Sequence, residues 1–133
     1  MSKVFLGGTC GKSTWREQLI PFLKIDYFNP VVDDWTEEMI EIEEDEKQNK
    51  CDIHLYVITK DMEGVYSIAE AVESCFNPDK TTIFFVIKKG FDKGMLKSLR
   101  ATEQLILRNG GIIKSPGEVQ TIKDLADFLN EFE

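Results

Sequence analysis

Short apolar runs recur along the chain at spacings that predict five β-strands. Residues 81–87, TTIFFVI, form an uninterrupted run of the kind found in strands that are covered on both faces of a sheet. Residues 53–58 form a second such run, and the shorter runs end at glycine or at Asn29-Pro30. Strands are predicted at residues 3–6, 25–28, 53–58, 81–87 and 112–113.

Between these runs, apolar positions recur at a spacing of three and four residues, which predicts amphipathic helices. The first helix begins at Ser13 or Thr14, either of which can cap it, and Pro21 is expected to shorten or kink it. The second, residues 37–49, is largely polar and is expected to pack shallowly. The remaining helices are predicted at residues 67–76, 95–107 and 119–132.

Strands that alternate with helices predict a doubly wound α/β fold with right-handed crossovers. We expect a flavodoxin-like, five-stranded parallel sheet of order 2-1-3-4-5 within a three-layer α/β/α arrangement. A length of 133 residues suffices for one domain with an ordinary core, so residues 1–133 are expected to form a single domain.

A sheet of this order places its switch point between the first and third strands, and ligands bind outside the carboxyl ends of these strands. Residues 7–14, 29–35 and 59–70 would border that crevice. Glu70, on the expected first turn of the helix after the third strand, is therefore a candidate catalytic residue. The alternative is that Glu70 only complements the helix dipole, an effect of about 0.3–1 kcal/mol.

Charge and cysteine content narrow the class of protein. Nine carboxylates and no base lie in residues 33–46, and the net charge of the chain is −8. This balance offers no basic surface for a phosphate backbone, so nucleic-acid binding is disfavoured. No apolar run approaches the roughly 18 residues of a membrane span, no signal peptide is expected, and three unpaired cysteines suit a cytoplasmic protein.

The segment Gly11-Lys12-Ser13 has the ending of a phosphate-binding P-loop but not its spacing. That motif needs four residues between its two glycines, and Gly7 and Gly11 are separated by three. A nucleoside triphosphatase is therefore disfavoured. The loop is either a tight strand-to-helix turn or a place where main-chain N–H groups meet a ligand.

Three separated blocks, VFLGGTCGKSTWR, IDYFNPVVDDWT and CDIHLYVITKDMEGVYSIAEAVE, occur in this order between residue 3 and about residue 90. Together they resemble the nucleoside 2-deoxyribosyltransferase-like family, to which the 2'-deoxynucleoside 5'-phosphate N-hydrolases are related. The resemblance implies the flavodoxin-like fold and cleavage of the N-glycosidic bond of a nucleoside or nucleotide. It also implies that Glu70 is the catalytic glutamate.

The implied chemistry needs two carboxyl groups. A carboxylate beside C1' can stabilise the developing oxocarbenium charge or bond covalently to that carbon, and a second acid protonates the leaving base. Asp61 lies in the loop before the helix that carries Glu70 and is a candidate for this second acid. The resemblance implies a further acid from the second helix, which a residue count places at Glu44 and a helical wheel places at Glu43, so both stay open.

Substrate-binding candidates come from the three loops and from aromatic residues that could stack on a base. Trp15 and Trp35 could equally be packing residues, and Ser67 could be only a helix cap. His54, within an apolar strand, is expected to be a core histidine. The candidates are Gly7, Gly8, Thr9, Trp15, Asn29, Asp33, Trp35, Glu43, Gly64, Tyr66 and Ser67.

Two hypotheses follow from the sequence. The first is an enzyme, a deoxyribosyltransferase or nucleosidase with Glu70 as nucleophile. The second is a non-catalytic module on the same fold that binds a nucleotide-like ligand or a protein. We expect a small-molecule nucleoside or nucleotide as partner, a homodimer, and neither a metal ion nor a cofactor, since no Cys/His cluster has ligand spacing.

Overall fold

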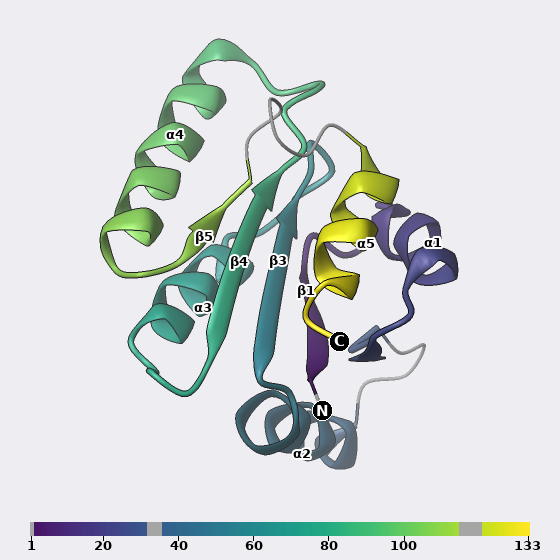
Figure 1. The fold of residues 1–133 in the computed structure, drawn as a ribbon. Helices are drawn as coiled ribbons and strands as arrows, with labels where there is room; N and C mark the ends of the chain where they lie inside the picture. The colour runs from purple at the N-terminus through teal and green to yellow at the C-terminus, as the bar shows by residue number, and fades with distance from the viewer. Residues whose placement is uncertain (1, 32–35, 115–120) are drawn as a thin grey trace.

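The five strands of the protein form one all-parallel sheet of order β2-β1-β3-β4-β5, which confirms the predicted topology. The computed structural model describes residues 2–31, 36–114 and 121–133. The strands appear in Figure 1 and are β1 (Lys3–Gly8), β2 (Asp26–Phe28), β3 (Ile53–Ile58), β4 (Thr81–Val86) and β5 (Ile112–Ile113).

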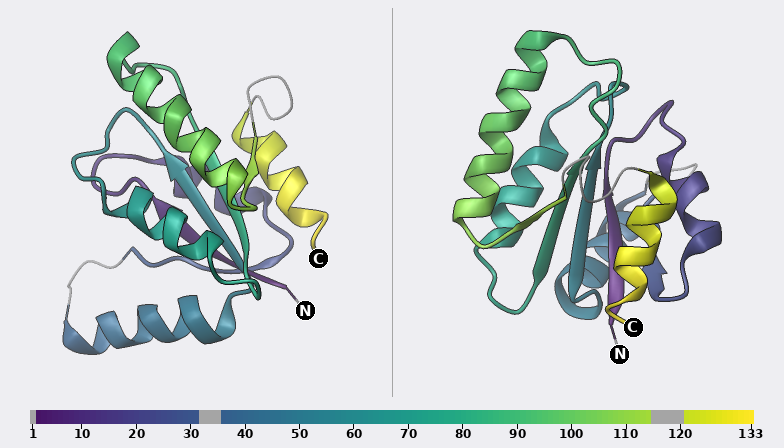
Figure 2. Two further views of the ribbon diagram at one scale, coloured as in Figure 1. Left: turned by 90° about the vertical axis from the view of Figure 1, so that its left-hand side faces the viewer. Right: turned by 45° about the horizontal axis from the view of Figure 1, so that its top comes forward.

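Helices cover both faces of the sheet. Figures 1 and 2 show α3 (Tyr66–Cys75) and α4 (Lys93–Arg108) on one face, with α1 (Trp15–Leu19) and α5 (Ile122–Asn130) on the other. As expected, Pro21 ends the first helix early, because it lies in the single 3-10 turn Ile20–Phe22 that follows α1. The result is the three-layer α/β/α arrangement of the sequence prediction.

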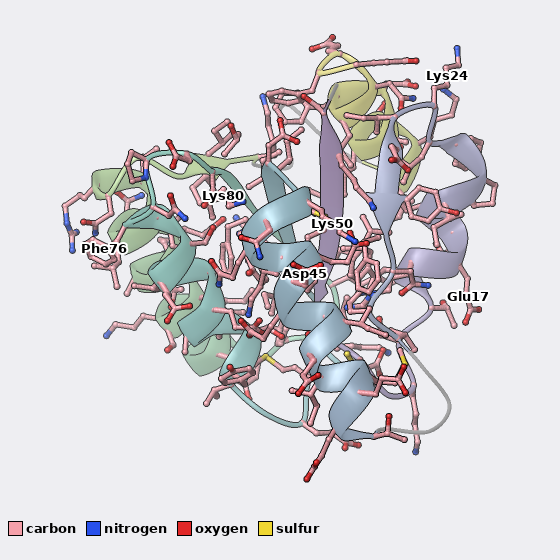
Figure 3. All side chains as sticks on the ribbon, turned by 90° about the horizontal axis from the view of Figure 1, so that it is seen from below. Glu17, Lys24, Asp45, Lys50, Phe76 and Lys80 are labelled. Atoms are coloured by element: carbon pink, nitrogen blue, oxygen red, sulfur yellow. The ribbon has the colours of Figure 1, made fainter. Side chains whose placement is uncertain are left out.

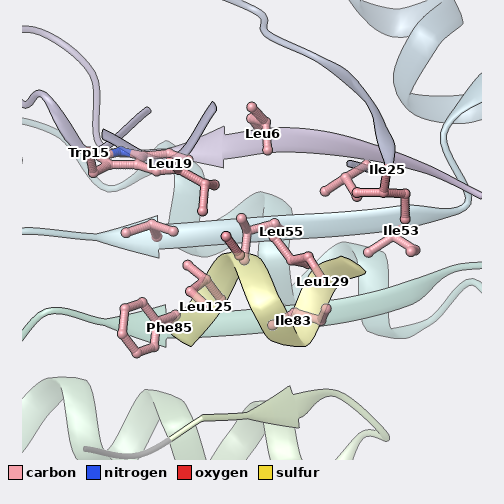
Figure 4. Close-up of a cluster of buried hydrophobic side chains, with 13 residues drawn as sticks. Leu6, Trp15, Leu19, Ile25, Ile53, Leu55, Ile83, Phe85, Leu125 and Leu129 are labelled. Carbon is pink, nitrogen blue, oxygen red and sulfur yellow. The ribbon is translucent and has the colours of Figure 1, made fainter. Parts of the chain in front are cut away.

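The larger hydrophobic core lies between the sheet and the α1/α5 layer (Figure 4). Leu6 of β1, Leu55 of β3 and Leu125 of α5 are fully buried there, and Trp15 fills the space at the start of α1. A second cluster, which includes Tyr56 and Ala71, joins the opposite face to α3 and α4. Alternate residues of β3 therefore serve different cores, which is why its sequence is largely apolar.

The acidic segment forms α2 (Glu37–Asp45), whose α-helical part has no buried residue, in agreement with the shallow packing expected for it. Thr36 caps it by accepting a hydrogen bond from the Met39 N–H. The helix does not continue to residue 49 as predicted but widens into a π-helical turn, Glu46–Lys50. Figure 3 shows α2 from below, with Asp45 and Lys50 labelled.

The π-helical turn carries the buried charges of this segment. Glu46 forms an ion pair of 2.8 Å with Lys3, and the neighbouring Lys47 is also buried. Turns of this kind in helices are frequent at functional sites. None of the described helices is long and apolar enough to cross a membrane.

Candidate active site

A cavity of about 750 Å³ lies at the carboxyl ends of β1 and β3, the predicted switch point of the sheet. Its walls are the loop after β1, the segment that leads into α3, the inner side of α2 with its π-helical turn, and Pro30-Val31. Four carboxylate residues and two basic residues line it. These are Glu43, Glu44, Glu63, Glu70, Arg16 and Lys47.

The loop after β1 is held close to β3. Gly8 has a φ of 116°, and a Cβ at this position would overlap the main chain of Val57, so the turn requires glycine. The Thr9 N–H donates to the Val57 carbonyl at 2.8 Å, and the Thr9 hydroxyl accepts from the Thr59 N–H at 2.9 Å. The two loops that border the cavity are thus bonded to each other.

Arg16 holds the loop after β1 in place through hydrogen bonds to main-chain carbonyls. Its buried guanidinium donates from Nε to the Leu6 carbonyl at 2.9 Å and from Nη1 to the Thr9 carbonyl at 2.7 Å. Nη2 donates to the Gly8 carbonyl at 3.3 Å, and the guanidinium stacks 4.4 Å above the Trp15 ring. Burial lowers the pKa of Arg16 from its ordinary value. Arg16 therefore supports the wall of the cavity.

The central feature of the cavity is a lysine held between two carboxylates. Lys47 Nζ lies 3.0 Å from Glu70 Oε2 and 3.0 Å from Glu44 Oε1. The side chains of Lys47, Glu70 and Glu44 are 5%, 12% and 52% exposed. Burial alone would lower the pKa of Lys47, but hydrogen bonds to Glu70 and Glu44 outweigh it and raise that pKa. Lys47 therefore favours its charged form.

Glu43 lies beside this group in a different environment. Burial raises the pKa of the Glu43 carboxyl, and the nearby charge of Glu70 raises it further, against the opposing effect of Lys47. Glu43 is thus protonated more readily than an ordinary glutamate, whereas Glu70 accepts a hydrogen bond from an ammonium group. Such a difference in surroundings is typical of two carboxyl groups of which one acts as acid and the other as nucleophile.

Tyr56 contributes a buried hydroxyl behind the cavity. Its side chain is 0% exposed, and its hydroxyl has no hydrogen-bond partner among the described residues. Burial raises the pKa of this phenol, and the charges of Glu70 and Glu73 raise it further, so it stays protonated. Gly7 lies against the Tyr56 ring, where a Cβ would overlap it.

Replacing Tyr56 by phenylalanine is expected to leave the free energy of unfolding unchanged or to raise it, within about 1 kcal/mol, because a buried donor without an acceptor costs stability. Urea unfolding of both proteins measures the difference. A loss of about 2 kcal/mol or more would show that the hydroxyl gains a partner in solution, contrary to this expectation.

The structure brings most of the predicted residues to the cavity, but not all of them. Trp15 is 2% exposed in the larger core and donates from Nε1 to the Thr9 carbonyl, so it is a packing residue that no base can reach. Asp61 and Asn29 do not line the cavity, and Asp33 and Trp35 lie outside the described residues. Those that line it are Gly7, Gly8, Thr9, Glu43, Glu44, Gly64, Tyr66, Ser67 and Glu70.

The start of α3 differs from the expectation. The helix begins at Tyr66 with Val65 as its N-cap residue, so Ser67 is not the cap and Glu70 lies beyond the first turn. Stabilisation of a carboxylate by the helix dipole is confined to the first turn of the helix. The alternative that Glu70 only complements the dipole is therefore disfavoured. The nearest charge to the Glu70 carboxylate is instead the ammonium group of Lys47, which donates a hydrogen bond to it.

Two residues at this site were not singled out as site residues in the sequence. Lys47 lies in an acidic helix where basic residues are expected to face solvent, and only the π-helical turn brings it inward. Arg16 lines the cavity, yet three main-chain carbonyls occupy its guanidinium. Within the described ranges, no group of three or more His, Cys, Asp or Glu side chains could hold a metal ion.

Fold and cavity together define a doubly wound α/β protein with clustered carboxylates at its switch point. Residues 1–91 match the model of a family described as nucleoside 2-deoxyribosyltransferase like. The chain belongs to this family, and the family suggests nucleoside glycosyl transfer. No curated protein and no solved structure matched the chain.

Proposed function

We propose that the protein cleaves the N-glycosidic bond of a nucleoside or nucleotide, with Glu70 as nucleophile. The observation that carries the proposal is the state of Glu70 in the cavity. Its Oε2 accepts a hydrogen bond from Lys47, while its Oε1 has no hydrogen-bond partner among the described residues and remains open for reaction.

The spacing of the acids supports this chemistry. Because Glu70 Oε2 and Glu44 Oε1 bond to the same ammonium group, these oxygens are no more than about 6 Å apart. Glu43 precedes Glu44 and lines the same cavity. A retaining mechanism uses two carboxyl groups that face the same cavity, one as nucleophile and one as acid.

In the first step, Glu70 Oε1 forms a bond to C1' as the bond from C1' to the base nitrogen breaks. The electron pair of that bond leaves with the base, and Glu43 gives its proton to the base. The product is a glycosyl ester of Glu70. In the second step, water or another base attacks C1', its proton passes to Glu43, and Glu70 leaves as a carboxylate. Water gives hydrolysis and a base gives transfer.

Glu43 is preferred to Glu44 as the acid because Glu44 is half exposed and bonded to Lys47. Glu43→Gln is expected to lower kcat about 100-fold, whereas Glu44→Gln lowers it less than about threefold because Glu44 is half exposed and Lys47 keeps its contact with Glu70. Since the pKa of Glu43 is raised and its protonated form is required, kcat falls as pH rises through that pKa. This alkaline limb should vanish in Glu43→Gln.

The control is Glu41→Gln, an exposed position on the same helix that does not line the cavity. Its rate and pH profile should equal those of the wild type. A larger loss in Glu44→Gln than in Glu43→Gln would assign the proton to Glu44 and contradict the choice made here.

A panel of nucleosides and deoxynucleoside 5'-monophosphates, with and without a second free base, tests the function itself. Chromatography is expected to show release of base from at least one member. The second hypothesis, a module that binds without turnover, predicts instead that a panel member raises Tm while no base is released. Such a result would reject the catalytic proposal.

A further inference from the structure

Lys47 lies in the wall of the cavity, and its ammonium group has no part in the two steps proposed above. Its ammonium group is buried and contacts Glu70, which lies 23 residues further along the chain. A buried charge is costly unless it is paired and hydrogen-bonded. The structure pairs it with two carboxylates at once.

The main chain of Lys47 is also anchored. The carbonyl of Lys47 accepts a hydrogen bond of 2.7 Å from His54 Nε2, and His54 Nδ1 lies 2.8 Å from the Ser74 hydroxyl. The Ser74 hydroxyl is in turn 2.5 Å from that of Thr82. Burial lowers the pKa of His54, so the neutral ring donates from Nε2 and accepts from Ser74 at Nδ1.

This buried chain joins β4, α3 and β3 to the π-helical turn. Ser74 lies one turn along α3 from Glu70, so the same helix carries both the anchor of the Lys47 main chain and the partner of its ammonium group. The lysine is thus held at both ends relative to Glu70. His54 is a core histidine, as the sequence predicted, and it fixes the turn that bears the lysine.

We propose that Lys47 is a positioning residue, which holds Glu70 by Oε2 so that Oε1 faces the reacting carbon. This inference rests on the proposed function. The ammonium group also offsets the mutual repulsion of the Glu44 and Glu70 carboxylates.

Lys47 also has a part in the second step of the reaction. When the bond from C1' to Oε1 breaks, its electron pair returns to Glu70 and restores the carboxylate charge. An ammonium group already bonded to Oε2 stabilises this leaving carboxylate without rearrangement. In the first step the same contact lowers the nucleophilicity of Glu70, so its benefit lies in orientation and in turnover of the ester.

The contact itself can be tested without turnover, by a double-mutant cycle of Lys47→Met and Glu70→Gln in urea unfolding. We expect the two changes to be coupled by about tenfold in the unfolding equilibrium constant. The matched control is the exposed pair Lys123 and Asp127, 2.9 Å apart, which should show coupling of about twofold or less. Coupling at Lys47 and Glu70 no larger than in the control would overturn the inference, whatever the enzyme activity.

Positioning is tested on the substrate found in the panel. Lys47→Met is expected to lower kcat about 30-fold and to leave KM within about threefold, since the lysine holds the nucleophile and does not bind substrate. Lys47→Arg keeps the charge, so its kcat should be at least about threefold higher than that of Lys47→Met. Unchanged kcat in Lys47→Met, or equal loss in both variants, would overturn the inference.

The two proposals fail in different ways. If the wild type releases no base from any panel member, the proposed function fails, and the unfolding cycle still decides whether Lys47 holds Glu70. The wild type could instead be active while kcat is unchanged in Lys47→Met, or equally reduced in Lys47→Met and Lys47→Arg. In that case only the proposed role of Lys47 fails.

Discussion

Glu70→Gln is expected to lower kcat for base release at least about 1,000-fold, because an amide oxygen cannot form the glycosyl ester. KM should change little, since the amide keeps the shape of the side chain. Steady-state kinetics on the substrate identified in the panel measures both values. The protein should remain folded, because Glu70 is at the cavity wall and not within either hydrophobic core.

Glu73→Gln provides the matched control for this variant. Glu73 lies one turn further along α3, is exposed, and does not line the 750 Å³ cavity. Its kcat should stay within about twofold of the wild type, as for exposed positions in general. Equal activity of Glu70→Gln and Glu73→Gln would remove Glu70 from the mechanism.

Arg16→Met is expected to lower the free energy of unfolding by about 3 kcal/mol, because it removes three hydrogen bonds from a charged donor to buried main-chain carbonyls. Those carbonyls belong to Leu6, Gly8 and Thr9, in the wall of the cavity. Arg16→Lys should also destabilise the protein, since an ammonium group cannot reproduce the planar fork of the guanidinium. Urea unfolding at constant pH measures these differences.

Arg100→Met, at an exposed position of α4, is the control for the loss of a positive charge. Its free energy of unfolding should differ from that of the wild type by no more than about 0.5 kcal/mol. A loss in Arg16→Met as small as in Arg100→Met would mean that the hydrogen bonds of the guanidinium do not support the loop.

The topology could be predicted because the apolar runs and the helical periodicity between them indicated the same fold. The runs at 53–58 and 81–87 required strands buried on both faces, and the helices between strands required parallel pairing with crossovers. The order of the sheet then fixed which loops meet, which is how Gly7, Gly64 and Glu70 could be placed at one cavity in advance.

The errors have local physical causes. Trp15 was a candidate for stacking because it follows the first loop, but which way a residue at the start of a helix points depends on how that helix packs. Here α1 turns Trp15 into the core under α5. The pairing of Lys47 with Glu70 depends on the π-helical turn and on residues far apart in sequence, so periodicity alone could not reveal it.

The central claim, covalent catalysis by Glu70, is tested most directly by the configuration at C1' of the product. A β-nucleoside from the active panel would be cleaved in the presence of methanol, and the methyl glycoside would be assigned by NMR. Two displacements at C1', first by Glu70 and then by methanol, predict the β-anomer. The α-anomer as the initial product would show a single displacement and contradict the account.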